Sequence, residues 1–352
     1  MFKTFAVHGN VPAFLLVCTL IPLVKDPLGD LASSDNYRAI AISALLLKLF
    51  DLVVLQLEGN KLLCDEMQFG FQPKSSTSMC SWAVTTVIDY YTRAGTTVYG
   101  CTMDLSKAFD MVEWCTLFNQ LRERGVSPVF LRVILVNYSD QYCDVRWNGA
   151  FSCRFSIRNG VRQGAISSAI FFTIYVDKLI TEMRKTRLGC TIGGHYFGIM
   201  IYCDDIFLLS ASRAGLQAMV TVCEKFANKF HLKFSTNDDP TKSKTKCIIF
   251  CKNSLAQKGV LPIKLNGKLL PFCPLVKHLG CYLQGNNSMT NDCDIKRGQF
   301  IGKIHSLSQE FYFVTPSVLV KFYNIYTTAF FGSNLYDLFG KSTDQHDPLL
   351  LD

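Results

Sequence analysis

The segment Tyr202-Cys203-Asp204-Asp205 places two adjacent carboxylates between two short apolar runs, at residues 198–201 and 206–209. Short apolar runs of this kind are typical of buried strands, so the segment predicts a hairpin with both acids at its tip. Asp is unfavourable in strands, and two like charges at close range oppose each other's ionisation. The tip therefore suits Mg²⁺, a cation that binds carboxylate oxygens. From these four residues alone, an ordinary Asp-Asp turn is the alternative.

The bulk composition indicates a folded chain with room for more than one subdomain. It has 352 residues, of which 49% are hydrophobic and 18% charged, and its formal net charge is +8. Such a chain buries a sizeable core and carries too few charges to be disordered. The positive charge permits a polyanionic partner without requiring one. The longest apolar stretch near the start, residues 11–24, contains two prolines and is too short to span a membrane, so no membrane partner is expected.

The fifteen cysteines are scattered along the chain. Cys247 and Cys251 come nearest to a pair of metal ligands, but no histidine pair at finger spacing follows them, which argues against zinc. Cysteines beside apolar residues, such as Cys101 and Cys143, are expected to behave as small buried hydrophobes. Because no secretory signal is present, they predict a reducing intracellular compartment rather than a secreted protein.

Hydrophobic periodicity predicts a mixture of helices and strands. Helices are expected at residues 40–57, 79–91, 167–184 and 216–230, and strands at 97–105, 198–201, 206–209, 232–234 and 247–250. A hairpin of residues 142–147 and 154–157 would turn at Asn148-Gly149. A further helix would begin after Ser106 and end at Gly125. This order predicts an α+β fold with helices on one face of a sheet.

A third acid, Asp104, ends the strand expected at residues 97–105. If that strand and the Tyr202–Asp205 hairpin are neighbours, Asp104, Asp204 and Asp205 meet in one place. Three carboxylates can hold two divalent cations about 3.5–4 Å apart, the arrangement used for in-line displacement at phosphorus. A capping residue for the following helix is the alternative for Asp104 taken alone.

Residues between the acids fit a nucleotide substrate. Arg162 and Gln163 lie in the glycine-rich segment 159–164 at an expected helix start, where side-chain and backbone donors meet phosphate and sugar. The glycines of this segment allow close backbone approach, although an ordinary loop is the alternative. Three lysines alternate over residues 242–246 and either contact phosphates or solvate the edge of a sheet.

Three segments, in this order, resemble motifs A, B and C of reverse transcriptases: residues 104–110, 159–164 and 202–205. Flanking pieces at 21–25, 36–40, 68–72, 76–77 and 278–280 resemble the non-LTR (LINE-like) retrotransposon branch. The resemblance extends from about residue 12 to about residue 340. It implies a right-hand polymerase with an N-terminal fingers part at 1–95, a palm with the remaining fingers segments and the primer grip at 96–285, and a partial thumb at 286–352.

The resemblance also implies an activity, which is synthesis of DNA on an RNA template. A DNA primer 3′-hydroxyl would be extended with deoxynucleoside triphosphates with the help of two Mg²⁺ ions, for which Mn²⁺ can substitute. The catalytic metal ligands would be Asp104, Asp204, Asp205 and the carbonyl of Leu105. The nucleotide contacts would be Arg38, Phe109, Arg162, Gln163 and Gly164. The primer and template contacts would be Tyr202, Cys203, His278, Leu279 and Gly280.

Two of these roles have alternatives. Phe109 would be the steric gate that excludes the ribose 2′-OH, the group that distinguishes RNA from DNA, but it also fits a core position. Arg38 would donate to the triphosphate through its bidentate guanidinium, or it is an ordinary surface arginine. Cys203, Ser167 and Ala39 depart from the residues usual in the family, and none of these departures removes a catalytic group.

The extent of the chain leaves the function open between two classes. No endonuclease domain precedes the fingers and no Cys/His knuckle follows the thumb, so a fragment or 5′-truncated copy is expected. The competing function is therefore an inactive nucleic-acid-binding remnant of a decayed element. An RNA-dependent RNA polymerase is disfavoured by Phe109, and the flanking pieces fit a group II intron maturase or a telomerase-like relative less well.

Overall fold

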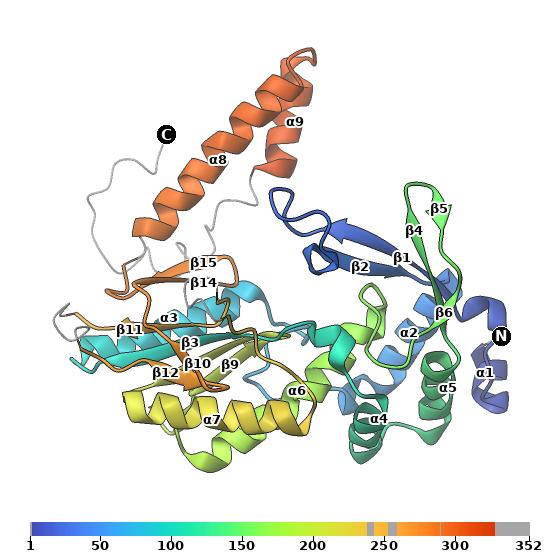
Figure 1. The fold of residues 1–352 in the computed structure, drawn as a ribbon, viewed down its shortest axis with the longest axis horizontal. Helices are drawn as coiled ribbons and strands as arrows, with labels where there is room; N and C mark the ends of the chain where they lie inside the picture. Colours follow the sequence, from blue (N-terminus) through green and yellow to red (C-terminus); the bar gives the residue numbers. More distant parts are fainter. Residues whose placement is uncertain (1, 238–242, 253–258, 289, 328–352) are drawn as a thin grey trace.

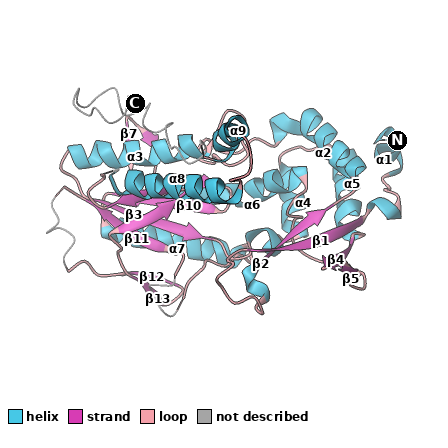
Figure 2. Ribbon diagram, turned by 90° about the horizontal axis from the view of Figure 1, so that it is seen from above, coloured by secondary structure: helices cyan, strands magenta, loops and turns pink. Residues whose placement is uncertain are grey.

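The computed structural model describes residues 2–237, 243–252, 259–288 and 290–327. Two sheets occupy opposite ends of the molecule, and each is covered by helices (Figures 1 and 2). The long helix α6 (Ile166–Thr186) connects the two ends, because it contacts α2 (Leu45–Glu58) and α4 (Trp114–Glu123) as well as α7 (Arg213–Lys229). The α+β fold expected from the sequence is confirmed.

A four-stranded antiparallel sheet forms the centre of one end. Its strands are β3 (Val98–Asp104), β9 (Ile199–Tyr202), β10 (Asp205–Ser210) and β11 (Lys246–Phe250), in the order β11-β3-β10-β9. Ile206 to Leu209 on β10 are at most 1% exposed, as is each residue of the run Ile199–Ile201 on β9. The predicted hairpin is therefore confirmed, and β10 lies directly beside β3.

Helices and a small hairpin cover this sheet on opposite sides. In Figure 1, α6 and α7 lie below the sheet, and the hairpin of β14 (Leu275–His278) and β15 (Cys281–Gln284) lies above it. The apolar stripe predicted on α7 is buried in the core. Helix α3 (Thr77–Arg93) packs against β3 and β9. Beyond the hairpin, α8 (Thr290–Glu310) and α9 (Pro316–Tyr326) rise as a pair (Figure 1).

The second sheet has five strands from two distant parts of the chain. They are β1 (Val17–Val24), β2 (Tyr37–Ile42), β4 (Tyr142–Trp147), β5 (Ala150–Phe151) and β6 (Phe155–Ser156). Strand β1 pairs in parallel with β4, and the other pairs are antiparallel. Helices α1 (Phe2–His8) and α5 (Pro128–Ser139) complete this end, where the hairpin predicted at Asn148-Gly149 is confirmed.

The remaining described elements are short. They comprise the hairpins β7–β8 (Thr191–Ile192, His195–Tyr196) and β12–β13 (Ile263–Leu265, Lys268–Leu270), and the 3₁₀ turns η1 (Ala13–Leu15), η2 (Ser34–Asn36), η3 (Gly59–Lys61) and η4 (Ala108–Met111). None of the helices described by the structure combines the length and apolarity needed to cross a membrane. Most of the apolar stretch 11–24 instead forms strand β1.

Three predictions about local structure are wrong. Residues 40–42 are not helical, because they pair with β1 as the end of β2, and α2 begins only at Leu45. The helix expected after Ser106 is interrupted, because Lys107 has φ +50° and Val112 is extended; only η4 and then α4 form. The strand expected at 232–234 is reduced to an isolated bridge between Phe234 and Leu105.

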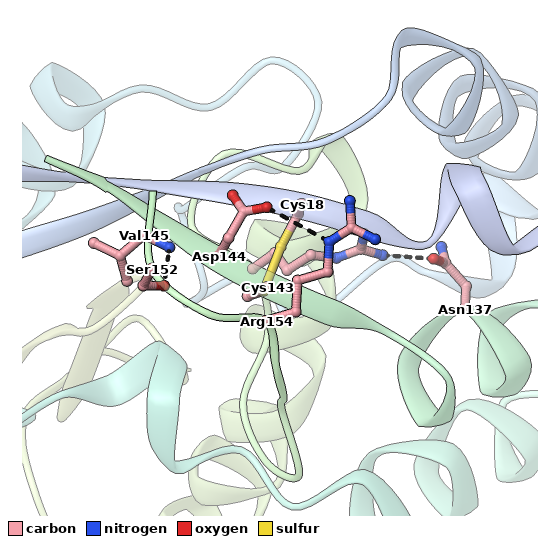
Figure 3. The surroundings of a disulfide bond; sticks show 8 residues. Cys18, Asn137, Cys143, Asp144, Val145, Ser152 and Arg154 are labelled. Carbon is pink, nitrogen blue, oxygen red and sulfur yellow. Dashed lines mark hydrogen bonds and ion pairs between the residues drawn. A yellow bond between two sulfur atoms is a disulfide. The ribbon is translucent and has the colours of Figure 1, made fainter. Parts of the chain in front are cut away.

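The prediction that Cys143 is a free buried thiol is wrong. Cys18 and Cys143 stand opposite each other on the parallel strands β1 and β4 and form a disulfide (Figure 3). Cys143 is buried as expected, but it is not a free thiol. Cys101 and Cys247 are fully buried on the neighbouring strands β3 and β11, with their sulfur atoms 3.5 Å apart, as expected of small hydrophobes.

Strand β10 gives a direct test of this core. Replacing the fully buried Leu208 with alanine is expected to lower the free energy of unfolding by about 2–5 kcal/mol, because the change leaves a cavity in the centre of the sheet. Leu57→Ala on α2 is the matched control, since Leu57 is 63% exposed, and it should cost less than about 1 kcal/mol. Urea denaturation of both variants measures the difference. Equal losses would contradict the assigned core.

Candidate active site

Strand register brings the predicted acids together. Asp205, the first residue of β10, is paired directly with Asp104, the last residue of β3. Asp204 lies in the tight turn that joins β9 to β10, between Asp205 and Cys203. Cys203 has φ +60°, a left-handed backbone conformation that residues other than glycine rarely adopt. The two strands are therefore neighbours, as the predicted site requires, and the three acids lie at or directly beside their ends.

The three carboxylates are electrostatically strained. Burial, and then the nearby charges of Asp204 and Asp104, raise the pKa of Asp205 to about 6. Burial and then the charge of Asp104 raise the pKa of Asp204. Burial also raises the pKa of Asp104, although Lys244 opposes that shift. Partly buried acids that repel one another are what a cation-binding site requires before its cation is bound.

Two basic side chains face these acids. The Nζ atom of Lys244 lies 3.8 Å from Oδ2 of Asp104. Arg38, which comes from β2 of the other sheet, lowers the pKa of Asp204. Positive charges therefore approach the carboxylates from both ends of the molecule. Of the other two alternating lysines, Lys246 begins β11, and Lys242 lies outside the described residues.

A cavity of about 260 Å³ opens beside the acids. Asp104, Asp205 and Lys244 line one side of it, and residues His278–Gly280 from the β14–β15 turn line the other. His278 is buried, with its ring 4.9 Å from the ring of Phe207, and burial lowers its pKa to about 4. Its imidazole is therefore neutral at physiological pH. Leu279 and Gly280 both have positive φ and make the turn tight.

The glycine-rich segment 159–164 lies between the two sheets. The amide of Ala41 on β2 donates to the carbonyl of Gln163 over 2.7 Å. A Cβ on Gly164, which has φ +117°, would lie 2.7 Å from the carbonyl oxygen of Ala41. On its other side the segment contacts η4, where the amide of Val161 donates to the carbonyl of Phe109 over 2.8 Å. The segment thus ties the strand carrying Arg38 to the turn carrying Phe109.

Phe109 and Leu105 are both packed against the core. The half-buried ring of Phe109 stacks on Phe172 of α6, with centroids 5.0 Å apart and planes 19° apart. Leu105 is 5% exposed, directly after Asp104. The core alternative for Phe109 is therefore present in the structure. Its role as a steric gate, and the ligand role of the Leu105 carbonyl, remain predictions.

Arg162 does not point toward solvent as a phosphate contact would. It is 7% exposed, and its Nη2 donates to Oδ1 of Asn137 over 2.9 Å. Its guanidinium carbon lies 5.5 Å from the ring centroid of Tyr138. This burial weighs against direct contact between Arg162 and a nucleotide. It favours a role in fixing the segment that carries Gln163, whose side chain is half-buried.

The residues preceding Asp204 have little freedom. Tyr202 is half-buried, and its ring lies 6.4 Å from that of Phe71. Cys203 is 4% exposed, and burial raises the pKa of its thiol, so it stays protonated and is a poor metal ligand. The segment 67–70 runs along β9 next to them, a contact that was not predicted from the sequence. The sequence signal at this position was the flanking piece at residues 68–72, which resembles the non-LTR branch but does not indicate a contact with β9.

The donor set fits a hard divalent cation, because it consists of carboxylates and a backbone carbonyl. In the part of the chain that the structure describes, no three His, Cys, Asp or Glu side chains are already gathered closely enough to hold a metal ion. The carboxylates would therefore have to turn toward an ion to bind it. Their mutual repulsion, which a bound cation would relieve, favours this rearrangement.

The raised pKa of Asp205 predicts that the free energy of unfolding depends on pH. Because the pKa of Asp205 is raised on folding, the metal-free protein should lose stability as pH rises from about 4 to about 6. Asp205→Asn should remove this loss and, at pH 7 in EDTA, raise the free energy of unfolding by about 1–2 kcal/mol after allowance for solvent screening. Urea denaturation at pH 5 and pH 7 measures both effects. The control is Asp294→Asn, an exposed acid paired with Arg297.

Asp294→Asn should change stability by less than about 0.5 kcal/mol at either pH. A destabilised Asp205→Asn protein at pH 7 would contradict the strain assigned to the acids.

Curated relatives of the chain are proteins of retrotransposable elements. The Pol polyprotein of the type-2 retrotransposable element R2DM of Drosophila melanogaster is 23% identical over 229 residues, 65% of this chain and 21% of that protein. The Pol polyprotein of the type-1 retrotransposable element R2 of Popillia japonica is 27% identical over 228 residues, 64% of this chain and 31% of that protein. The chain thus spans less than a third of either relative.

Solved structures share the fold at low sequence identity. Apo telomerase from Candida tropicalis has a TM-score of 0.53 and 11% identity, over 78% of this chain and 48% of that one. The same organism's telomerase in complex with a fragment of telomeric RNA has a TM-score of 0.53 and 12% identity, over 83% of this chain and 47% of that one. The fold is thus the right-hand polymerase fold. A family model described as reverse transcriptase (RNA-dependent DNA polymerase) matches residues 25–257. The chain therefore belongs to the reverse transcriptase family.

Proposed function

We propose that this chain is an RNA-directed DNA polymerase that extends a primer 3′-hydroxyl with deoxynucleoside triphosphates on an RNA template. The observation that carries the proposal is the pairing of Asp205 with Asp104, which places these two carboxylates beside a cavity, with Asp204 next to them in the turn. Family membership independently supports the same activity. Because the matched relatives are much longer, the proposal concerns the catalytic domain and not a complete retrotransposition protein.

Asp104, Asp204 and Asp205, with the carbonyl of Leu105, would hold two Mg²⁺ ions. When bound, these ions would activate the primer hydroxyl and offset the charge of the departing pyrophosphate. The protein itself supplies positioning, because the acids sit at the ends of packed strands and in a tight turn. Burial, and then the neighbouring acidic charges, raise the pKa values of Asp204 and Asp205, and a bound cation would offset both effects.

Basic and polar residues around the acids suit a triphosphate. Arg38 is electrostatically coupled to Asp204, and a guanidinium donates to phosphate in a bidentate manner. Gln163 and Gly164 are held against β2, the strand that carries Arg38, and so border the same space. Lys244 would neutralise charge on the opposite side. In this arrangement Arg162 does not contact the nucleotide; it fixes the segment that carries Gln163 and Gly164 by binding Asn137.

The primer terminus would lie between the catalytic hairpin and the β14–β15 turn. Asp104 and Asp205 line one side of the cavity, and residues His278–Gly280 line the other; Tyr202 and Cys203 directly precede the acids of the hairpin. The template–primer duplex would be gripped through its phosphate backbone rather than its sequence, to which the net charge of +8 is suited. An intracellular ribonucleoprotein, nuclear or cytoplasmic, is the setting that such a substrate requires.

Asp204→Asn tests the proposed function directly. The variant should lose at least about 100-fold of the primer-extension rate on poly(rA)/oligo(dT) with Mg²⁺, because one ligand of the proposed metal site is neutralised. Asp89→Asn is the control, since Asp89 forms a surface pair with Arg93 on α3, and it should extend primers like the wild type. Gel-based extension with folded proteins measures the rates.

The same assay separates the proposal from the competing function. If folded wild-type protein binds the template–primer without extending it, the chain is an inactive nucleic-acid-binding remnant and the polymerase proposal fails. Preferential incorporation of ribonucleotides would instead indicate an RNA polymerase.

Phe109→Ala tests the selection of the sugar. If the ring excludes the ribose 2′-OH, the variant should raise the use of ribonucleotides relative to deoxynucleotides on the order of 10–100-fold. Phe118→Ala is a suitable control, because Phe118 also packs against the core but contacts Tyr138 instead. Single-nucleotide incorporation kinetics measure the ratio. Equal ratios in the wild type and the folded Phe109→Ala variant would leave Phe109 a core residue only.

A further inference from the structure

The outer edge of the central sheet is covered by a segment from the N-terminal part of the chain. Residues 67–70 run parallel to β9, with Gln68 bridging to Ile201. The amide of Ile201 donates to the carbonyl of Met67 over 2.9 Å, and the amide of Phe69 donates to the carbonyl of Ile201 over 2.8 Å. The segment therefore pairs with the outer edge of the sheet through one isolated parallel bridge, beside the β9–β10 hairpin.

The side chain of Gln68 reaches from this segment into the turn of the hairpin. It is 1% exposed, and its Oε1 accepts hydrogen bonds from the amide of Gly70 over 2.9 Å and from the amide of Cys203 over 3.0 Å. Cys203 is the left-handed residue that directly precedes Asp204. A Cβ on Gly70 would overlap the amide nitrogen of Cys203, so only glycine permits this approach.

The geometry identifies the amide oxygen as the part of Gln68 that matters. Among the described residues, Nε2 of Gln68 has no hydrogen-bond partner, although it is buried. A buried donor without a partner is unfavourable, and a methionine of similar shape would avoid that cost. The two hydrogen bonds that Oε1 accepts offset the cost of the unpartnered Nε2. One of them gives the amide of the left-handed Cys203 its hydrogen-bond partner.

We propose that Gln68 is a positioning residue that fixes the turn carrying Asp204 and Asp205 through the amide of Cys203. The proposal rests on the polymerase function argued above. Gln68 contacts neither carboxylate in any described hydrogen bond; it acts through the backbone between β9 and β10. Without it, the left-handed residue loses its hydrogen-bond partner, and both carboxylates that follow it gain freedom.

The segment is anchored independently of Gln68. Asp65 forms two hydrogen bonds with Arg184 of α6, of 3.1 and 2.8 Å, and its amide donates to Oδ1 of Asp177 over 2.8 Å. Changing the side chain of Gln68 should therefore leave the backbone of residues 65–69 in place. This separation makes a substitution at Gln68 a test of positioning rather than of folding.

The test compares Gln68→Met with Gln68→Glu in the full chain. Methionine removes the acceptor, so kcat for primer extension should fall about 10-fold or more, while KM for the nucleotide changes less than about 3-fold. Glutamate keeps an acceptor oxygen and should restore kcat to within about 3-fold of wild type. Gln120→Met is the matched control, because Gln120 is also buried with one unpartnered amide atom in the described structure, and its Nε2 donates instead to the carbonyl of Tyr175.

Amide hydrogen exchange gives a second measurement that does not need activity. Exchange at Cys203 should accelerate in Gln68→Met and remain as in the wild type in Gln68→Glu and Gln120→Met. Unchanged kcat and unchanged exchange in a folded Gln68→Met protein would overturn the proposal. If Gln68→Met fails to fold, the Gln68→Glu variant tests the proposal instead. A kcat of Gln68→Glu below about a tenth of the wild-type value would then overturn the proposal. If wild-type protein extends no primer, the polymerase function fails, and exchange at Cys203 still decides the role of Gln68.

Discussion

The antiparallel pairing of β3 with β10 is the constraint on which the rest of this structure depends. It sets Asp104 directly opposite Asp205, and the β9–β10 turn adds Asp204 beside them. The resulting negative charge is unfavourable in the metal-free protein, as the raised pKa of each acid indicates. A folded chain tolerates such crowding because the surrounding strands are almost completely buried, so the core outweighs the repulsion.

Three separate parts of the chain approach this site and restrict it. The segment 67–70 contacts the β9–β10 turn from the edge of the sheet, and residues 159–164 tie β2 to η4. The β14–β15 turn closes the cavity from above, with a neutral His278 against Phe207. Rigid support of this kind matches what catalysis by positioning requires, because small displacements of reacting groups are costly in rate. The division into fingers, palm and thumb at residues 95 and 285 remains a prediction.

Much of the central sheet could be predicted from the sequence, because its strands are continuous apolar runs and its acids stand at their ends. The errors arose where tertiary contacts override local pattern. Residues 40–42 fit a helical period but pair with β1, and the left-handed Lys107 interrupts the helix expected after Ser106. The disulfide between Cys18 and Cys143 depends on a parallel pairing of strands 125 residues apart, which no local signal encodes. Arg162 is likewise buried against a distant segment, because its guanidinium donates to Asn137 of α5.

The central claim is that Asp104, Asp204 and Asp205 form a divalent-cation site that works on a primer terminus. Anomalous diffraction at the manganese edge, from crystals of the protein with template–primer, a deoxynucleoside triphosphate and Mn²⁺, tests it most directly. The account predicts anomalous peaks within ligand distance of all three carboxylates, beside the cavity lined by His278. Extension-competent crystals with Mn²⁺ bound elsewhere, and no peak at these acids, would contradict it.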